Sequence, residues 1–175
     1  YRYNQAMSAP LFEPVFAALN EAKVRYVVVG GLAVVLHGHP RLTADVDIVL
    51  DLEPEAARRA MAALKTIGLK ARAPVDPIAF ADPSQREAWI AEKGMMVFSL
   101  FSPSDPLLIL DLFVRYPVAF EGLWARSLAV DLRGLQVRIA SLDDLIVMKR
   151  AAARPQDLQD IEALEELRKR GKGGG

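Results

Sequence analysis

The chain has 175 residues, and its 22 basic side chains balance its 22 acidic ones, so the formal net charge at pH 7 is zero. This length suits one domain with a single hydrophobic core. A neutral chain has no long-range attraction to nucleic acid or to an anionic membrane, so such a partner would need a local patch. Cysteine is absent, which excludes disulfides, thiol catalysis and thiolate metal sites and fits a cytoplasmic protein.

The two ends of the chain are expected to lie outside the folded domain. Residues 1–6 lack the charged and apolar regions of a secretion signal, and they precede Met7, so we expect them to be additions to the native chain. The glycine-rich segment 171–175 is expected to be a flexible tail. No apolar run is long enough to span a membrane. The expected domain covers residues 8–170, with a core over 8–140 and C-terminal helices over 141–170.

The first half of the chain predicts helices that alternate with strands. Ser8 is expected to cap a helix whose apolar residues, from Leu11 to Leu19, recur at helical spacing. β-Branched runs bounded by glycine, proline or aspartate predict strands. We expect such strands over 25–29 and 46–50, a third strand over 69–73, and helices over 32–37 and 54–67.

The second half predicts two hairpins followed by two helices. Ser141 is expected to cap the first of these helices, and Pro155 is expected to open the second. We expect a helix over 84–92, hairpin strands over 95–101 with 107–114 and over 128–132 with 135–139, a helix to residue 152, and a last helix with an apolar stripe of Leu158, Ile161, Leu164 and Leu167. This order predicts an α/β (α+β) fold with a mixed, mainly antiparallel sheet, flanking helices and a C-terminal helical pair.

Two aspartates begin the strand over 46–50. Side chains at positions i and i+2 of a strand point to the same face, about 6.6 Å apart, so Asp45 and Asp47 could converge on one or two divalent cations. Val46 and Ile48 would then face the core. A lone Asp-x-Asp pair is a weak signal, because surface strands often carry two acidic residues.

Asp111 interrupts an otherwise apolar strand. A buried carboxylate is costly unless it is paired or binds a metal ion. An exposed strand edge or a pair with Arg115 is the alternative explanation. Taken together with Asp45 and Asp47, Asp111 is predicted to be a third metal ligand.

Gly30 and Gly31 follow the strand over 25–29 and precede the acidic pair. Glycines at such a turn let the backbone approach a phosphate closely, and the next helix offers free N–H groups to the anion. An ordinary turn from strand to helix is the alternative.

The spacing of these motifs resembles a known signature. Gly30-Gly31, a gap of thirteen residues and then Asp45-Val46-Asp47-Ile48 are similar to the nucleotidyltransferase motif of the DNA polymerase β superfamily. In that family a Gly-Gly or Gly-Ser turn precedes the strand with two acidic metal ligands, and a later strand supplies the third. Asp111, in the sequence LDLF, matches this third position. The resemblance implies an enzyme that binds Mg²⁺ or Mn²⁺ through Asp45, Asp47 and Asp111 and uses an NTP as substrate.

Segment 141–164 is similar to the closing helices of the AbiEii-like branch, which includes toxins of bacterial toxin–antitoxin systems. There a helical lysine contacts the nucleotide or a catalytic phosphate, and an Arg-x-x-Asp-x-x-Asp pattern follows. The matching residues are Lys149, Arg154, Asp157 and Asp160. The resemblance implies a catalytic and nucleotide-binding role for Lys149, with tRNA as a candidate acceptor and an antitoxin as a candidate partner.

The spacing of apolar residues in the helix also constrains where the Lys149 side chain can lie. Leu142, Leu145 and Ile146 lie on the same helical face as Lys149, so its side chain either extends to solvent or enters a polar cleft. The acidic residues elsewhere favour the cleft. Asp157 and Asp160 are expected to hold Arg154.

Arg41 and Thr43 precede Asp45 with the spacing R-x-T-x-D-x-D. Arg41 could bind the triphosphate and Thr43 could orient the metal ligands, and a solvated loop is the equal alternative. His37 and His39 lack a third metal ligand at sensible spacing, and we assign them no catalytic role.

The predicted function is transfer of a nucleoside monophosphate from an NTP to an acceptor hydroxyl. The acceptor is RNA, a protein or a small molecule of the antibiotic type, and no membrane partner is expected. A non-catalytic nucleotide-binding module is the alternative. The candidate local basic patch for tRNA consists of Arg133, Arg138, Lys149, Arg150 and Arg154.

Overall fold

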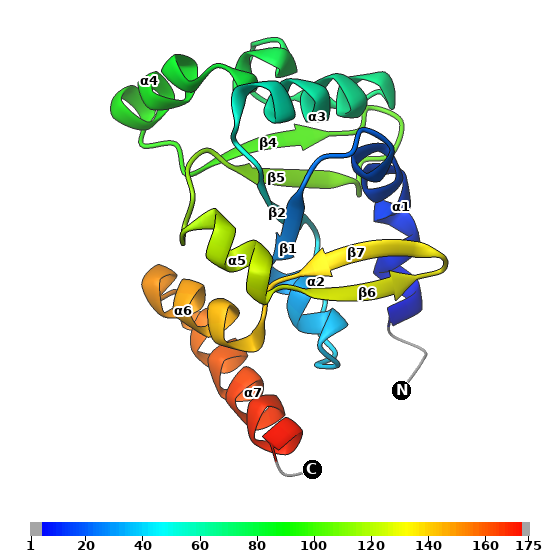
Figure 1. The fold of residues 1–175 in the computed structure, drawn as a ribbon, viewed down its shortest axis with the longest axis vertical. Helices are drawn as coiled ribbons and strands as arrows, with labels where there is room; N and C mark the ends of the chain where they lie inside the picture. Colours follow the sequence, from blue (N-terminus) through cyan, green and yellow to red (C-terminus); the bar gives the residue numbers. More distant parts are fainter. Residues whose placement is uncertain (1–4, 173–175) are drawn as a thin grey trace.

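A computed structural model describes the backbone of residues 5–172 and the side chains of residues 11–171. It confirms the predicted mixed fold, in which helices flank one seven-stranded sheet (Figure 1). Residues 1–4 and 173–175, which fall in the two segments expected to lie outside the domain, are not among the described residues.

The strands are β1 (Tyr26–Val29), β2 (Val46–Leu50), β3 (Lys70–Ala71), β4 (Val97–Phe101), β5 (Ile109–Phe113), β6 (Leu128–Leu132) and β7 (Leu135–Ile139). The helices are α1 (Gln5–Glu21), α2 (Gly30–Leu36), α3 (Pro54–Thr66), α4 (Pro83–Lys93), α5 (Phe120–Arg126), α6 (Leu142–Ala152) and α7 (Pro155–Lys172), with a 3₁₀ helix over Pro77–Ala81. The strand order is β3-β4-β5-β2-β1-β7-β6.

The sheet mixes parallel and antiparallel pairs. The predicted hairpins β4–β5 and β6–β7 are confirmed as antiparallel pairs, and β1 pairs antiparallel with β2. β2 runs parallel to β5, and β1 runs parallel to β7. The two hairpins therefore join the central β1–β2 pair through parallel contacts on either side.

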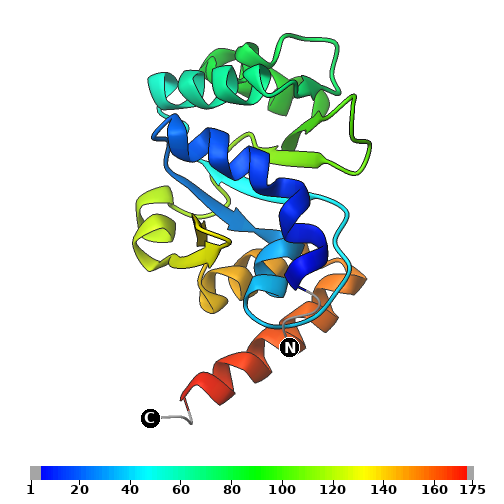
Figure 2. The ribbon, with the colours of Figure 1, turned by 90° about the vertical axis from the view of Figure 1, so that its right-hand side faces the viewer.

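The helices lie around this sheet in separate groups. Figure 1 places α3 and α4 at one end of the molecule and α6 and α7 at the other. Figure 2 shows α1 crossing the sheet between these ends, where it contacts both α3 and β7. The α6–α7 pair packs on itself and touches α2, so it closes the end at which β1 runs into α2.

The burial of the strands alternates from residue to residue. In β4 and β5 every second side chain is buried, and these include Phe98, Leu100, Leu110 and Leu112, each at most 1% exposed. The intervening residues are only half-buried. One face of this half of the sheet therefore forms the core, and the other face is left partly open.

Several predicted boundaries were wrong. Helix α1 begins at Gln5, so Ser8 lies inside the helix and does not cap it. Helix α7 runs to Lys172, so Gly171 belongs to the helix and not to a tail. Helix α5 and the 3₁₀ helix were not predicted, because each is short and follows proline-containing segments that read as loops.

The predicted apolar stripe of α7 was also wrong in part. Leu164 is fully buried, but Leu158 is 60% exposed. The buried face instead carries Asp157, Asp160 and Leu164, which follow one another at helical spacing. Helix α7 thus presents carboxylates, and not only apolar groups, to the rest of the protein.

Ser141→Ala should lower the free energy of unfolding by about 1 kcal/mol, because the Ser141 hydroxyl accepts the backbone N–H of Asp144 at 3.1 Å and caps α6. Urea unfolding monitored by circular dichroism measures the change. Ser84→Ala, at an exposed position in α4, is the matched control. Equal effects of the two substitutions would contradict the capping role.

Candidate functional site

A row of three polar side chains crosses the partly open face of the sheet. In the strand register, Asp47 of β2 lies opposite Asp111 of β5, and Asp111 lies opposite Ser99 of β4. Residues directly opposite one another in a sheet project to the same face. The Ser99 hydroxyl donates a hydrogen bond of 2.5 Å to Oδ1 of Asp111. The two aspartates predicted to share a cleft are therefore neighbours on one face.

This face forms the floor of a cavity of about 650 Å³. Its walls come from β2, β5, the loop before β2, and helices α2, α6 and α7. All eight residues predicted from the sequence to form the site line it: Gly30, Gly31, Arg41, Thr43, Asp45, Asp47, Asp111 and Lys149.

The carboxylates of this cavity are partly buried from solvent and repel one another. Burial, together with the charges of Asp45 and Asp111, raises the pKa of Asp47 to about 7, although Arg154 and Lys149 act in the opposite sense. Burial also raises the pKa of Asp111, against the hydrogen bond from Ser99, and Asp45 raises it further. The site thus concentrates negative charge that nearby cations only partly offset.

Within residues 11–171, no group of three or more acidic or histidine side chains stands close enough together to hold a metal ion. The chemistry of the donors nevertheless fits a hard divalent cation, because carboxylate oxygens are the ligands that Mg²⁺ and Mn²⁺ prefer. The raised pKa of Asp47 points the same way, since a cation would relieve the repulsion that causes it.

Gly30 is needed for the approach of the α2 turn to Asp47. Its φ is +65°, and a Cβ atom there would lie 2.1 Å from Oδ2 of Asp47. A Cβ on Gly31 would lie 2.9 Å from the Thr43 hydroxyl. The two glycines therefore let the turn pack directly against the acidic strand and the loop before it.

The loop before β2 is tied down at both of its predicted residues. The Thr43 hydroxyl donates to the backbone carbonyl of Asp45 at 2.9 Å. Arg41 forms an ion pair with Asp160 of α7, and only 24% of the Arg41 side chain is exposed. Neither residue is a freely solvated loop residue, which was the alternative drawn from the sequence.

Lys149 enters the cavity and not the solvent, which is the alternative that the acidic residues elsewhere in the sequence favoured. It is 6% exposed, and its ammonium group lies 2.6 Å from Asp160 and 3.4 Å from Asp157. Asp157 also accepts hydrogen bonds from the Arg154 guanidinium, the nearest at 2.9 Å. The expectation that both aspartates hold Arg154 was wrong, because Asp160 is shared between Lys149 and Arg41.

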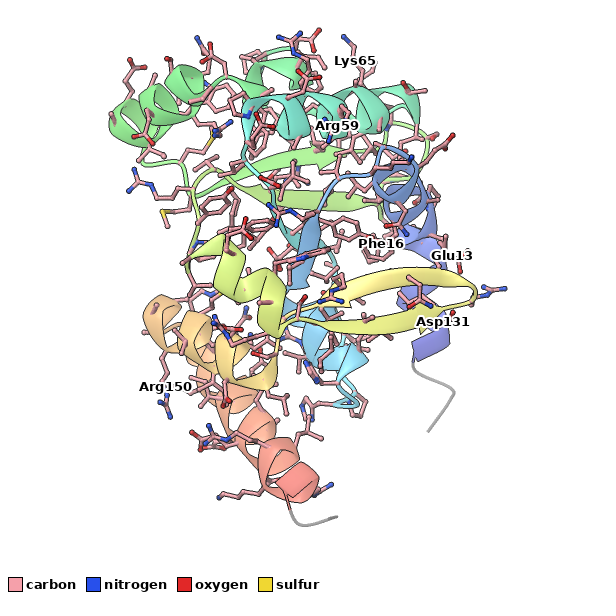
Figure 3. The ribbon with its side chains drawn as sticks, viewed as in Figure 1. Glu13, Phe16, Arg59, Lys65, Asp131 and Arg150 are labelled. Carbon is pink, nitrogen blue, oxygen red and sulfur yellow. The ribbon has the colours of Figure 1, made fainter. Side chains whose placement is uncertain are left out.

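The basic strip predicted for tRNA is not assembled. Arg133 pairs with Glu13, Arg150 pairs with Glu165, and Arg138 stacks over Trp124 with 4.8 Å to the ring centroid. Figure 3 shows Asp131 of the β6–β7 hairpin and Arg150 of α6 on opposite sides of the molecule. The hairpin and helix that carry the five residues thus do not present one continuous basic surface.

Sequence reasoning missed Ser99, which donates a hydrogen bond to Asp111. It also missed Met96 and Phe113, two apolar residues that line the cavity. The signal for Ser99 was present, since it is the one polar residue in the alternating strand VFSLF. The sequence assigned no catalytic role to His37. In the structure His37 is partly buried, and its Nε2 lies 2.8 Å from the Ala140 carbonyl oxygen.

Comparisons with known proteins identify the family of the chain and the proteins that share its fold. Residues 13–170 match a family model described as "Nucleotidyltransferase of unknown function (DUF6036)". A search of curated proteins found no match. Within the described residues, no helix is long and apolar enough to cross a membrane.

Solved structures with a similar fold include two antibiotic-modifying enzymes. The lincosamide antibiotic adenylyltransferase LnuA, with lincomycin bound, has a TM-score of 0.59 and 16% identity, over 90% of this chain and 96% of that one. ANT(2″)-Ia, in complex with adenylyl-2″-tobramycin, has a TM-score of 0.57 and 15% identity, over 96% and 98%. An antigenic nucleotidyltransferase-like protein from Paracoccidioides brasiliensis has a TM-score of 0.60 and 16% identity, over 91% and 75%.

Asp47→Asn should raise the free energy of unfolding by about 2 kcal/mol at pH 8 without divalent metal. The pKa of Asp47 in the folded protein, about 7, lies above the value of about 3.9 for an unfolded aspartate, so the ionised group destabilises the fold. The gain should shrink as the pH falls from 7 to about 4, where the group is protonated in both states. Chemical denaturation across this pH range measures it. Asp143→Asn, at an exposed position, serves as the control, and a gain independent of pH would contradict the explanation.

Gly30→Ala should destabilise the protein more than Gly68→Ala. Both glycines have positive φ, +65° and +90°, so each substitution costs about 1–2 kcal/mol in backbone strain. A Cβ at Gly68 would meet no atom within 4 Å, whereas one at Gly30 would collide with Asp47. Thermal unfolding measures the loss of stability in both variants, and the difference between the two losses gives the cost of the collision with Asp47. Equal losses would show that the turn does not pack tightly against Asp47.

Proposed function

The chain belongs to the family of nucleotidyltransferases of unknown function, and we propose that it transfers a nucleoside monophosphate from an NTP to a hydroxyl of a small-molecule acceptor. The observation that supports this most is the gathering of Asp45, Asp47 and Asp111 in one cavity with basic side chains. Such a cavity combines carboxylates that would bind a divalent cation with basic side chains that would bind the phosphates.

The triphosphate would bind to the basic residues of this cavity. Arg41, Lys149 and Arg154 all line it, and their present partners are only two carboxylates, Asp157 and Asp160. These three cations outnumber their two carboxylate partners, and a divalent cation held by the floor aspartates would offset the charge of those aspartates. Arginine binds phosphate through a planar fork and lysine binds it as a point charge, so the set suits a chain of phosphates.

Asp45, Asp47 and Asp111 would hold Mg²⁺ or Mn²⁺. When bound, such an ion supplies Lewis-acid stabilisation of the charge on the phosphates. The basic side chains on the walls of the cavity would orient the phosphates above this floor. Metal binding would also stabilise the fold by mass action.

In the reaction, the acceptor oxygen forms a bond to the α-phosphorus of the NTP, and the bond from this phosphorus to the bridging oxygen of pyrophosphate breaks. The acceptor proton would pass to Oδ2 of Asp111. Oδ1 of the same group already accepts the Ser99 hydroxyl, which leaves Oδ2 free and fixes its direction. Pyrophosphate leaves with the electrons of the broken bond.

A small molecule is the favoured acceptor for two reasons. The five basic residues that could have bound tRNA are dispersed, with Arg133 and Arg138 on or beside the β6–β7 strands and the other three in or after α6. Two proteins of similar fold carry an antibiotic or its adenylylated product. The other candidates are a tRNA acceptor with an antitoxin partner, as in the AbiEii-like branch, and a nucleotide-binding module without catalysis.

Transfer should depend on the carboxylates. Asp45→Asn, Asp47→Asn and Asp111→Asn should each lower transfer by about 10²–10⁴-fold, because each removes charge from the floor of the cavity. The assay incubates the protein with α-³²P-labelled NTPs, Mg²⁺ and either total tRNA or a metabolite extract, and separates labelled products by size. Asp143→Asn should keep full activity.

The distribution of label distinguishes the candidates. Label in small molecules supports the proposal, and label in RNA supports the tRNA alternative. NTP binding without label in either fraction supports the non-catalytic module. Full activity of the Asp47→Asn variant would refute the assignment of the carboxylates.

A further inference from the structure

A second compartment opens from the carboxylate cavity. It has a volume of about 320 Å³ and lies between the ends of β1 and β5 and one side of α6. Its surface is predominantly apolar, with walls that include Val29, Pro117, Leu145, Val147 and Met148. This volume is within the range of small-molecule sites, which is about 300–1,000 Å³.

The two compartments meet at shared residues. Gly30, Asp47, Lys149 and Arg154 line both of them, and so do Met96 and Phe113. A molecule held in the apolar compartment therefore has one end beside Asp47, where the α-phosphate would lie. Asp157 lines the apolar compartment alone, but its carboxylate is paired with Lys149 and Arg154. The other charged residues of the compartment lie at the shared boundary.

The polarity of the walls decides which substrate fits. A nucleobase carries several hydrogen-bonding groups along its edges, and their burial without partners costs free energy. Beyond the shared boundary, the compartment offers such an edge only aliphatic side chains, Pro117 and Met148, apart from the carboxylate of Asp157, which is already paired. An apolar ring or chain loses nothing by entering it. The apolar compartment thus suits the acceptor, and the larger polar cavity suits the nucleotide.

We propose that this compartment is the acceptor site, and that the acceptor has an uncharged apolar body with a hydroxyl at the end that reaches Asp47. The assignment rests on the proposed function, and it narrows the acceptor to a class that excludes polycationic sugars. Two rim residues are consistent with an apolar ligand that covers them: Met96 is 64% exposed and Val147 is 54% exposed.

The test observes binding without chemistry. Protein labelled with ¹³C at the methionine methyl groups reports on both compartments, because Met148 lines only the apolar one, Met96 lines both, and Met61 is fully buried in the core. The probes are benzyl alcohol, glucose as a hydroxylated molecule without an apolar body, and α,β-methylene-ATP with Mg²⁺, which cannot transfer its nucleotide. Benzyl alcohol should shift Met148 at millimolar concentration and leave Met61 unchanged, and glucose should shift neither.

The nucleotide analogue should shift Met96 and leave the response of Met148 to benzyl alcohol in place. Displacement of benzyl alcohol by the analogue would overturn the proposal, because the nucleobase would then occupy the compartment. Absence of a Met148 response to benzyl alcohol, or an equal response to glucose, would overturn it as well. Absence of any response to the analogue would contradict the proposed function instead, so the two failures are distinguishable.

A substitution locates the binding. Ala151→Trp adds bulk at an exposed position of α6 that lines the apolar compartment alone, and it should weaken benzyl alcohol binding at least tenfold. Ala62→Trp is the matched control, because it lies at an exposed position of α3, at the opposite end of the molecule from α6 (Figure 1). It should not change the affinity for benzyl alcohol. Equal affinities of both variants would place the alcohol elsewhere and refute the assignment.

Discussion

The repulsion among the carboxylates on one face of the sheet is the constraint on which the rest of the site depends. Asp47 and Asp111 stand side by side because β2 and β5 are paired in parallel. Their ionisation is opposed by burial, so the fold must bring positive charge close to them. It does so through α6, which supplies Lys149, and through the short connection to α7, which supplies Arg154. The C-terminal helical pair is thus an electrostatic part of the site as well as a packing element.

Helix α7 contributes the opposite charge. Asp157 and Asp160 lie on its buried face, where apolar residues were expected, and they hold the basic side chains in defined positions. Buried ion pairs of this kind add little net stability, because desolvation consumes most of the attraction. Their effect here is orientation: Lys149 is buried at the cavity, and Arg154 is held at its edge with 63% of its side chain exposed.

The sequence was most informative where chemistry and periodicity coincided. Apolar alternation around Asp47 and Asp111 identified two strands and the face that each aspartate would share, and the register agrees with that expectation. The contact of Arg41 with Asp160 could not be foreseen, because it joins residues 119 positions apart and no local pattern records such a pair. Short elements such as α5 were missed for a related reason, since one or two turns give too few residues for a periodic signal.

The ion pair between Arg41 and Asp160 has a consequence for how the protein matures. The floor of the cavity is encoded in the first two thirds of the chain, but the residues that fix its walls are encoded near the end. A polypeptide that ends after β7 would carry the three aspartates and Arg41 without Lys149, Arg154 or Asp160. The cavity would therefore be complete only when the last two helices are present, because they and their connection supply part of its walls.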